Sequence, residues 1–475
     1  MSGMTEYKWC LEVKPAPAIL VLAGAAGNLA GGKLFNALAE LGAAGLWPEG
    51  SRVIGCARRE WSDDDFRRFA AEHISAAGGR EVLRDFIFVP GDLVGAEFPP
   101  RLKAALDKVL ARWRGATAPA LIFHFAVGAA ELPGIAAALG GTGFFDNADR
   151  KFREIRVILE KPLGLSGADA EALAAGLRIH LKEAQIYRMD HFLGKDFVRN
   201  LLVTRFANRI FEPAWNSSHI SEIIICAAER DGVEGRAGYY DRSGCIRDMF
   251  QNHLLEMLAL TAMERPRAPG SAEIEKAKLR LLGRMRAASV RTARYSGYAN
   301  LPGVAGNSRT ETAALAVLEA DTPRWRGTRF TLLSGKAMAR DETWIKVRFR
   351  SPDCSPFRRV KAEDFAGDEL KFELRPREGM SLRLQVKMPG PNLCVGSAEL
   401  DFTFPAEAGA GLSAYARLFV EAMLGERDSF ATEAFSAAGW RIFDPVLERL
   451  AASPDPPAEY PPGIEPGVLF PEIDR

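Results

Sequence analysis

The first 190 residues alternate between short apolar runs and longer stretches with helical spacing. Residues 18–23, AILVLA, form an apolar run that stops at a glycine and leads into an alanine- and leucine-rich helical pattern over 29–41. Further apolar runs predict strands at 52–56, 86–89, 120–127 and 154–159, with helices between them that include 101–113 and 166–182. This alternation predicts an α/β domain with a doubly wound, parallel, Rossmann-like sheet.

The pattern changes from about residue 221. Strand-like runs then follow one another with few helices among them, as in SEIIICAAE, TAALAVLEA, WIKVRFR and SLRLQVKM. Such a succession favours an antiparallel sheet in a larger α+β domain. We therefore predict a dinucleotide-binding domain at 1–188 and a β+α substrate-binding and dimerisation domain at 189–475. Residues 266–272 and 300–308 read as surface loops, and the proline-rich stretch 453–471 as an extended tail.

Composition supports two domains and excludes several kinds of partner. The chain has 475 residues, 47% of them hydrophobic, and 62 basic against 61 acidic side chains give a net charge of +1. This balance offers no general attraction to nucleic acid or anionic membranes. No run approaches the roughly 20 apolar residues of a membrane span, and the N-terminus lacks the pattern of a signal peptide. We expect a cytoplasmic protein whose six scattered cysteines are reduced thiols.

The turn after the first strand is a candidate cofactor site. It reads Gly24-Ala25-Ala26-Gly27-Asn28-Leu29, a G-x-x-G pattern that is shorter than the full dinucleotide-binding fingerprint. Glycines let backbone amides approach a pyrophosphate, and the start of the following helix favours negative charge. The alternative is a purely structural turn.

The end of the second predicted strand distinguishes between the two nicotinamide cofactors. NAD sites usually place an acidic residue there, whereas arginine accommodates the 2′-phosphate of NADP. Here the chain reads Ala57-Arg58-Arg59. Two guanidinium groups can make charge-assisted contacts to a phosphate, so NADP is preferred and NAD is the alternative cofactor. The competing interpretation is a pair of solvated surface arginines.

Two of the six histidines lie in polar clusters. His191 and Lys195 are four residues apart and would share a helix face, where they could hold an anion such as a sugar phosphate. His253 lies near the start of a predicted buried helix and is the natural acceptor for the proton of an alcohol that loses a hydride. Asp190 or Asp248 is the candidate carboxylate that fixes its tautomer. A lone histidine would more simply be a core residue.

These segments resemble the glucose-6-phosphate dehydrogenase family, from about residue 18 to about residue 447. The similar stretches include GAAGNLAGGKLF, GCARR, EKPLG, YRMDHFLGK, RFANRIFEPAWN, GCIRDMFQNHLLEMLALTAME and GVAGNSRTET, and they occur in the family's order. The resemblance implies a dinucleotide-binding domain, a β+α domain and a cleft between them. It implies oxidation of glucose 6-phosphate at C1 to the 6-phosphogluconolactone with NADP, the step that opens the pentose phosphate pathway. It further implies no metal, and a homodimer or homotetramer assembled through the second sheet.

The resemblance also assigns roles to single residues. His253 matches the family's general base, Asp190 the carboxylate that orients it, and Lys161 a lysine between cofactor and sugar. The residues that match phosphate or sugar ligands are His191, Lys195, Glu229, Asp248, Lys336 and Lys33. The residues expected to contact the cofactor are Gly24, Gly27, Asn28, Leu29, Arg58, Arg59 and Lys161.

Several positions depart from the family pattern where the sugar should bind. Phe192 stands in place of a tyrosine, Asp341 in place of a lysine or arginine, and Arg375 in place of a glutamine. An aspartate near a phosphate opposes binding by like-charge repulsion. Two alternatives therefore stay open, a dehydrogenase of another hexose and a non-catalytic nucleotide-binding relative.

Overall fold

The computed structural model divides the chain into two compact units. It describes residues 14–473 except 76–77, 116, 149, 191, 195, 356, 358–360 and 404–411. Among the described residues, the N-terminal unit comprises those from 14 to 195 together with 412–437, and the C-terminal unit comprises those from 196 to 403 and from 438 to 473. The predicted boundary after residue 188 stays a prediction.

The N-terminal unit is built on one seven-stranded sheet whose strand order is β15-β6-β5-β4-β1-β2-β3. All neighbours are parallel except the pair of β15 and β6. Its strands are β1 (Ala18–Ala23), β2 (Arg52–Ala57), β3 (Phe86–Pro90), β4 (Ala120–Phe125), β5 (Ile155–Leu159), β6 (Ile186–Met189) and β15 (Phe430–Ala431). This arrangement confirms the predicted parallel, doubly wound sheet.

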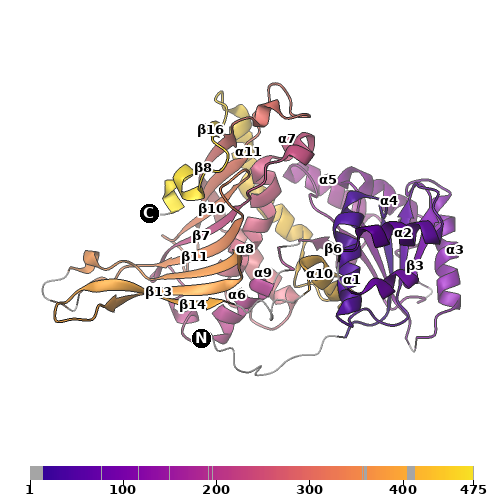
Figure 1. Cartoon of the computed structure of the whole chain (residues 1–475), viewed down its shortest axis with the longest axis horizontal. Helices are drawn as coiled ribbons and strands as arrows, with labels where there is room; N and C mark the ends of the chain where they lie inside the picture. Colours follow the sequence, from indigo (N-terminus) through magenta and orange to yellow (C-terminus); the bar gives the residue numbers. More distant parts are fainter. Residues whose placement is uncertain are drawn as a thin grey trace. The chain divides into compact units, whose positions relative to one another are not determined.

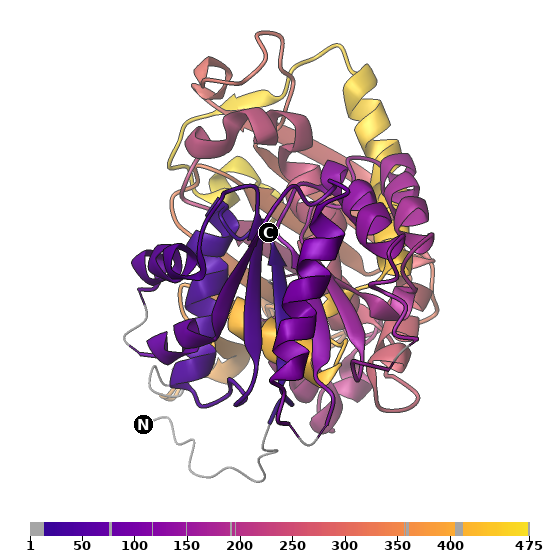
Figure 2. The ribbon, with the colours of Figure 1, turned by 90° about the vertical axis from the view of Figure 1, so that its right-hand side faces the viewer.

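Helices cover both faces of this sheet (Figures 1 and 2). They are α1 (Phe35–Ala43), α2 (Asp63–His73), α3 (Phe98–Ala111), α4 (Leu132–Gly140), α5 (Gly167–Arg178) and α10 (Ala414–Leu424), with shorter turns η1 (Ala30–Leu34), η2 (Arg80–Asp85), η3 (Ala129–Glu131) and η4 (Glu183–Gln185). The start of α2 is fixed by a reciprocal cap. The Ser62 hydroxyl accepts the Asp65 N–H, and the Asp65 carboxylate accepts the Ser62 N–H.

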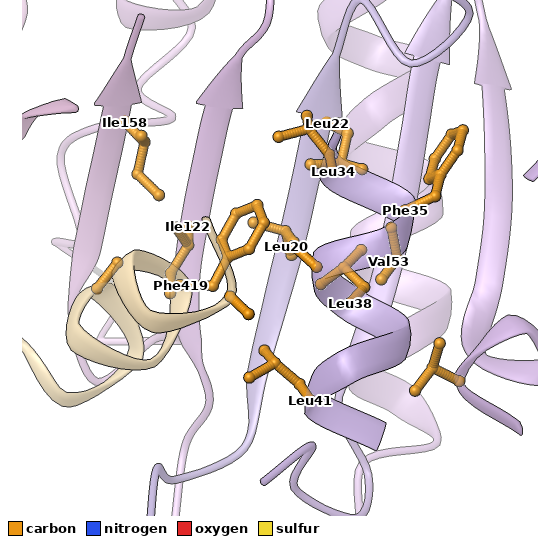
Figure 3. Packing of buried hydrophobic residues seen from close by; sticks show 14 of the residues in the cluster. Leu20, Leu22, Leu34, Phe35, Leu38, Leu41, Val53, Ile122, Ile158 and Phe419 are labelled. Carbon is orange, nitrogen blue, oxygen red and sulfur yellow. The ribbon is translucent and has the colours of Figure 1, made fainter. Parts of the chain in front are cut away.

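One face of the sheet is covered partly by a helix from far along the sequence. Leu20 of β1 and Ile122 of β4 point toward α1, where Leu38 lies, and toward Phe419 of α10 (Figure 3). All four side chains are at most 4% exposed. Helix α10 is therefore an integral part of the N-terminal core.

The C-terminal unit contains a nine-stranded sheet of order β14-β13-β12-β11-β7-β10-β9-β8-β16. Its strands are β7 (Ile220–Ala228), β8 (Met285–Tyr295), β9 (Ala313–Ala320), β10 (Arg329–Gly335), β11 (Glu342–Phe349), β12 (Glu369–Arg375), β13 (Gly379–Lys387), β14 (Val395–Thr403) and β16 (Ala458–Tyr460). The pairing is antiparallel as predicted, except that β10 is parallel to β7 and β16 to β8.

Helices and short turns complete this unit (Figure 1). They are α6 (Asp196–Ala207), η5 (Glu212–Ala214), η6 (Glu234–Arg236), α7 (Ala237–Cys245), η7 (Ile246–Leu254), α8 (Leu255–Ala262), α9 (Ser271–Leu282), η8 (Tyr298–Asn300), η9 (Ala362–Asp364), α12 (Pro466–Leu469) and η10 (Pro471–Ile473), together with α11 (Glu433–Ala452) from residue 438 on. Every residue of α8 is buried, including Glu256, whose carboxylate pairs with the Lys278 ammonium at 3.1 Å.

The prediction of an extended tail over residues 453–471 is wrong. Within it, β16 pairs with β8, and Tyr460 and Phe470 are each 1% exposed. The prolines of this stretch suggested an extended tail, but burial of the two aromatic rings holds the segment against the rest of the unit.

None of the helices in the described part of the chain combines the length and apolar composition needed to cross a bilayer. The cysteines at 56, 226, 245, 354 and 394 are free thiols. This agrees with the reduced state expected from their spacing, and Cys10 lies outside the described residues.

Candidate active site

The glycine turn after β1 is held tightly against the sheet. The N–H groups of Gly24 and Ala25 both donate to the carbonyl of Cys56, at 2.9 and 3.1 Å. Gly24 has φ +87°, and a Cβ there would lie 2.5 Å from the Ala126 oxygen. Only glycine fits this position, because the conformation is left-handed and the neighbouring backbone fills the space.

The remaining residues of the turn face outward. Gly27 and Asn28 are exposed and Leu29 is half-buried. A helical segment begins here and continues through η1, on which Lys33 is exposed. Backbone N–H groups at such a helix start lack partners within the helix and favour an anion. The turn therefore fits a cofactor pyrophosphate.

The two arginines after β2 are accessible at the same edge of the sheet. Arg58 and Arg59 are both exposed, and the Arg59 guanidinium carbon lies 4.9 Å from the ring centroid of Trp61. Because β1 and β2 are parallel, with Ala23 opposite Cys56, the arginines emerge at the edge where the glycine turn lies. Their charge and position fit the 2′-phosphate of NADP.

Lys161 and Asp190 form an ion pair. Their strands, β5 and β6, are parallel neighbours, so the residues that follow them emerge side by side. The Lys161 Nζ lies 2.6 Å from the Asp190 Oδ2, and these side chains are 17% and 0% exposed. Asp190 Oδ1 also accepts the Phe192 N–H at 2.9 Å. The carboxylate is thus oriented by two donors, one of them cationic.

A second polar cluster, made by His124, Glu160 and Tyr415, adjoins this pair and was missed from the sequence. His124 is fully buried, and its Nε2 lies 3.1 Å from the Glu160 Oε1. The Tyr415 hydroxyl donates to Glu160 Oε2 at 3.5 Å. Burial and then the Glu160 carboxylate raise the pKa of the Tyr415 phenol. The available signal was a histidine inside an otherwise apolar strand, with a carboxylate next to Lys161.

Replacing His124 with phenylalanine should destabilise the protein by about 1–3 kcal/mol, because Glu160 would then lack its buried donor. Urea unfolding followed by circular dichroism measures the change. Tyr415→Phe is the matched variant and should cost less, since its hydrogen bond is long. Equal stability of His124→Phe and wild type would contradict a structural role for this bond.

Three of the predicted sugar ligands meet in the C-terminal unit. The Lys336 Nζ lies 2.6 Å from Glu229 Oε2 and 3.7 Å from Asp248 Oδ2. Glu229 and Lys336 follow the parallel strands β7 and β10, in which Ala228 is opposite Gly335. The lysine side chain is 4% exposed, whereas the carboxylates are 35% and 22% exposed. A buried cation between two accessible carboxylates can bind the hydroxyl groups of a sugar, since it supplies donors and they supply acceptors.

The proposed base, His253, lies near the end of η7 and is 7% exposed. Asp248 is on the same segment. His191 and Lys195, the predicted phosphate ligands, lie outside the described residues.

Residues that depart from the family pattern have partners of their own. The Asp341 carboxylate accepts the Arg230 N–H at 2.9 Å. Arg340 pairs with Glu342 at 3.2 Å and with Glu465 at 3.3 Å. Arg375, at the end of β12, is exposed. Asp341 and Arg340 are therefore engaged by residues 230, 342 and 465.

Comparison with known proteins identifies the relatives of this chain. The sequence description "Glucose-6-phosphate dehydrogenase, NAD binding domain" matches residues 21–200, and "Glucose-6-phosphate dehydrogenase, C-terminal domain" matches 202–467. Glucose-6-phosphate 1-dehydrogenase 2 of Mycobacterium tuberculosis is 34% identical over 466 residues, which cover 93% of this chain and 90% of that protein. The cytoplasmic isoform of glucose-6-phosphate 1-dehydrogenase from Solanum tuberosum is 33% identical over 456 residues, which cover 94% of this chain and 88% of that protein. A solved glucose-6-phosphate dehydrogenase in complex with glucose 6-phosphate superposes with a TM-score of 0.89 at 26% identity, covering 98% and 99% of the two chains.

Proposed function

The chain belongs to the glucose-6-phosphate dehydrogenase family, and we propose that it oxidises glucose 6-phosphate at C1 to 6-phosphogluconolactone with NADP. The observation that carries this proposal is the meeting of Lys336, Glu229 and Asp248, which come from separate segments and offer the donors and acceptors that a sugar needs. A relative without catalytic activity would have no need for both a base and the carboxylate that orients it, the roles expected for His253 and Asp190.

In the proposed reaction, the neutral imidazole of His253 accepts the proton of the C1 hydroxyl. NADP, when bound, supplies the acceptor for the hydride that leaves C1. Lys161, held in place by its ion pair with Asp190, donates to the substrate, and Asp190 is the proposed partner of the base. His191 and Lys195 are the proposed phosphate ligands, assisted by Lys33.

The assay that tests this function follows reduced nicotinamide by absorbance with glucose 6-phosphate and either cofactor. Turnover with glucose 6-phosphate and NADP supports the proposal. Equal rates with phosphorylated and unphosphorylated hexoses would favour the other hexose dehydrogenase, and turnover of no sugar would favour the non-catalytic relative.

The arginines after β2 should determine the choice of cofactor. Replacing Arg58 and Arg59 together with alanine should raise the KM for NADP at least about tenfold, because charge-assisted bonds to the 2′-phosphate are lost. The KM for NAD should change less than about twofold, since NAD lacks that phosphate. Steady-state kinetics with both cofactors measures this, with Arg68→Ala on α2 as the control. An equal loss for both cofactors would show that the arginines do not contact the phosphate.

We also propose that the protein acts in the cytoplasm as a homodimer or homotetramer assembled through the C-terminal sheet. Strands β13 and β14 and the loop between them carry exposed apolar side chains, among them Met388 and Leu400, which are 45% and 61% exposed. Such a patch is typical of an interface. Analytical ultracentrifugation measures the assembly state.

A further inference from the structure

A buried carboxylate joins the two segments on which the sugar ligands stand. Glu311 lies just before β9 and is 7% exposed. We propose that Glu311 is a positioning residue, which fixes the start of η7 and thereby sets Asp248 at the correct place beside Lys336. This inference rests on the proposed function, because it concerns the binding of the same sugar phosphate.

The first contact is with the segment that carries Asp248 and His253. Glu311 Oε1 accepts the N–H of Ile246, the first residue of η7, at 3.0 Å. The backbone carbonyl of Glu311 accepts the Cys245 N–H at 3.1 Å. The first N–H groups of a helix need acceptors from outside it, and a carboxylate is the strongest that a protein offers.

Gly244 creates the room for this contact. Helix α7 is interrupted at Gly244, which has φ +66°, so a new helical segment starts directly after it. A Cβ on Gly244 would lie 2.6 Å from Glu311 Oε1. The glycine at the kink therefore leaves the space that the Glu311 carboxylate occupies.

The second contact is with the segment that carries Lys336. The Lys336 N–H donates to the carbonyl of Thr312, the residue after Glu311, at 2.9 Å. The Tyr460 hydroxyl donates to the Lys336 carbonyl at 2.7 Å and lies 2.9 Å from the Thr312 hydroxyl. Residues 311 and 312 thus bind two backbone segments, the start of η7, which carries Asp248, and the residue Lys336 itself.

The chemistry of the cap predicts which substitutions it tolerates. Burial raises the pKa of Glu311, and the hydrogen bond from Ile246 opposes this effect. What the helix start requires is an oxygen that accepts a hydrogen bond, and a glutamine side chain supplies one in nearly the same position. Alanine supplies none.

The experiment compares Glu311→Ala and Glu311→Gln with wild type in the intact protein. For Glu311→Ala we expect the KM for glucose 6-phosphate to rise about tenfold, as for the loss of a helix cap, while the KM for NADP stays within about twofold. For Glu311→Gln, both KM values should stay within about threefold of the wild-type values. Glu319→Ala, at an exposed position of β9, the strand that Glu311 precedes, is the matched control and should leave both constants unchanged.

Hydrogen exchange provides a readout that does not depend on activity. The amides of Cys245 and Ile246 should exchange faster in Glu311→Ala than in wild type. If Glu311→Ala does not fold, Glu311→Asp, which withdraws the carboxylate, should show the same rise in the KM for the sugar phosphate.

Three outcomes would overturn the proposal: an unchanged KM for glucose 6-phosphate, a parallel rise in both KM values, or a loss of folded protein with unaltered constants. A wild-type protein that does not turn over glucose 6-phosphate would instead refute the proposed function, and the exchange rates would still decide whether Glu311 holds the start of η7.

Discussion

Replacing His253 with asparagine should lower kcat by about 10²- to 10⁴-fold, which is the usual effect of removing a general base. Asparagine keeps polar atoms close to the backbone but cannot accept the proton of an alcohol. His253 is buried on η7, and because it is the proposed base, its loss should act on the chemical step. Binding of NADP should be unchanged, because the proposed cofactor residues belong to the N-terminal unit.

Steady-state kinetics gives kcat, and fluorescence titration of the nicotinamide gives the cofactor affinity. The same substitution at His219, which is exposed and bonded to Asn216, is the control and should leave kcat within about twofold. A His253→Asn protein with more than a tenth of the wild-type kcat would eliminate this histidine as the base.

Replacing Asp190 with asparagine should lower kcat/KM by about 10²- to 10³-fold. The asparagine oxygen can still accept the Phe192 N–H, but Lys161 loses the carboxylate that lies 2.6 Å from its ammonium. Breaking a buried ion pair from one side typically costs about 3–5 kcal/mol, because the remaining charge is left without its partner. The same change would deprive the proposed base of its carboxylate.

An exposed pair in the same unit provides the matched control. Asp107 and Lys151 lie 3.5 Å apart and are about half exposed, so Asp107→Asn should change kcat/KM less than about twofold. If Asp190→Asn keeps kcat/KM within threefold of wild type, this carboxylate has no role in catalysis, whether through its pair with Lys161 or through the proposed contact with His253.

The parallel sheet was predictable because its strands carry an unambiguous signal. The run at 18–23 is apolar at every position, and the structure buries all six residues, as expected for a strand covered on both faces. Helix α10 illustrates the opposite case. No element was predicted over 414–424, and nothing local indicates that this segment packs on a sheet formed from the first 190 residues.

The site residues stay predictions, but the contact between two of them shows what the sequence alone does not provide. The motifs named Glu229 and Lys336, yet their contact depends on β7 and β10 being parallel inside an otherwise largely antiparallel sheet. Strand order of this kind is set by tertiary packing and leaves no mark in a single strand. His124 and Glu311 were missed for a related reason, because their hydrogen-bond partners, Glu160 and Ile246, are distant in sequence.

The return of α10 to the N-terminal unit has a consequence for biosynthesis. A ribosome releases β1 and β4 long before it releases Phe419, which packs on the face that those strands share with α1. Until α10 has been synthesised, the N-terminal unit exposes the apolar surface that this helix later buries. Folding of the N-terminal unit therefore waits until the ribosome has translated the chain as far as residue 424 of 475.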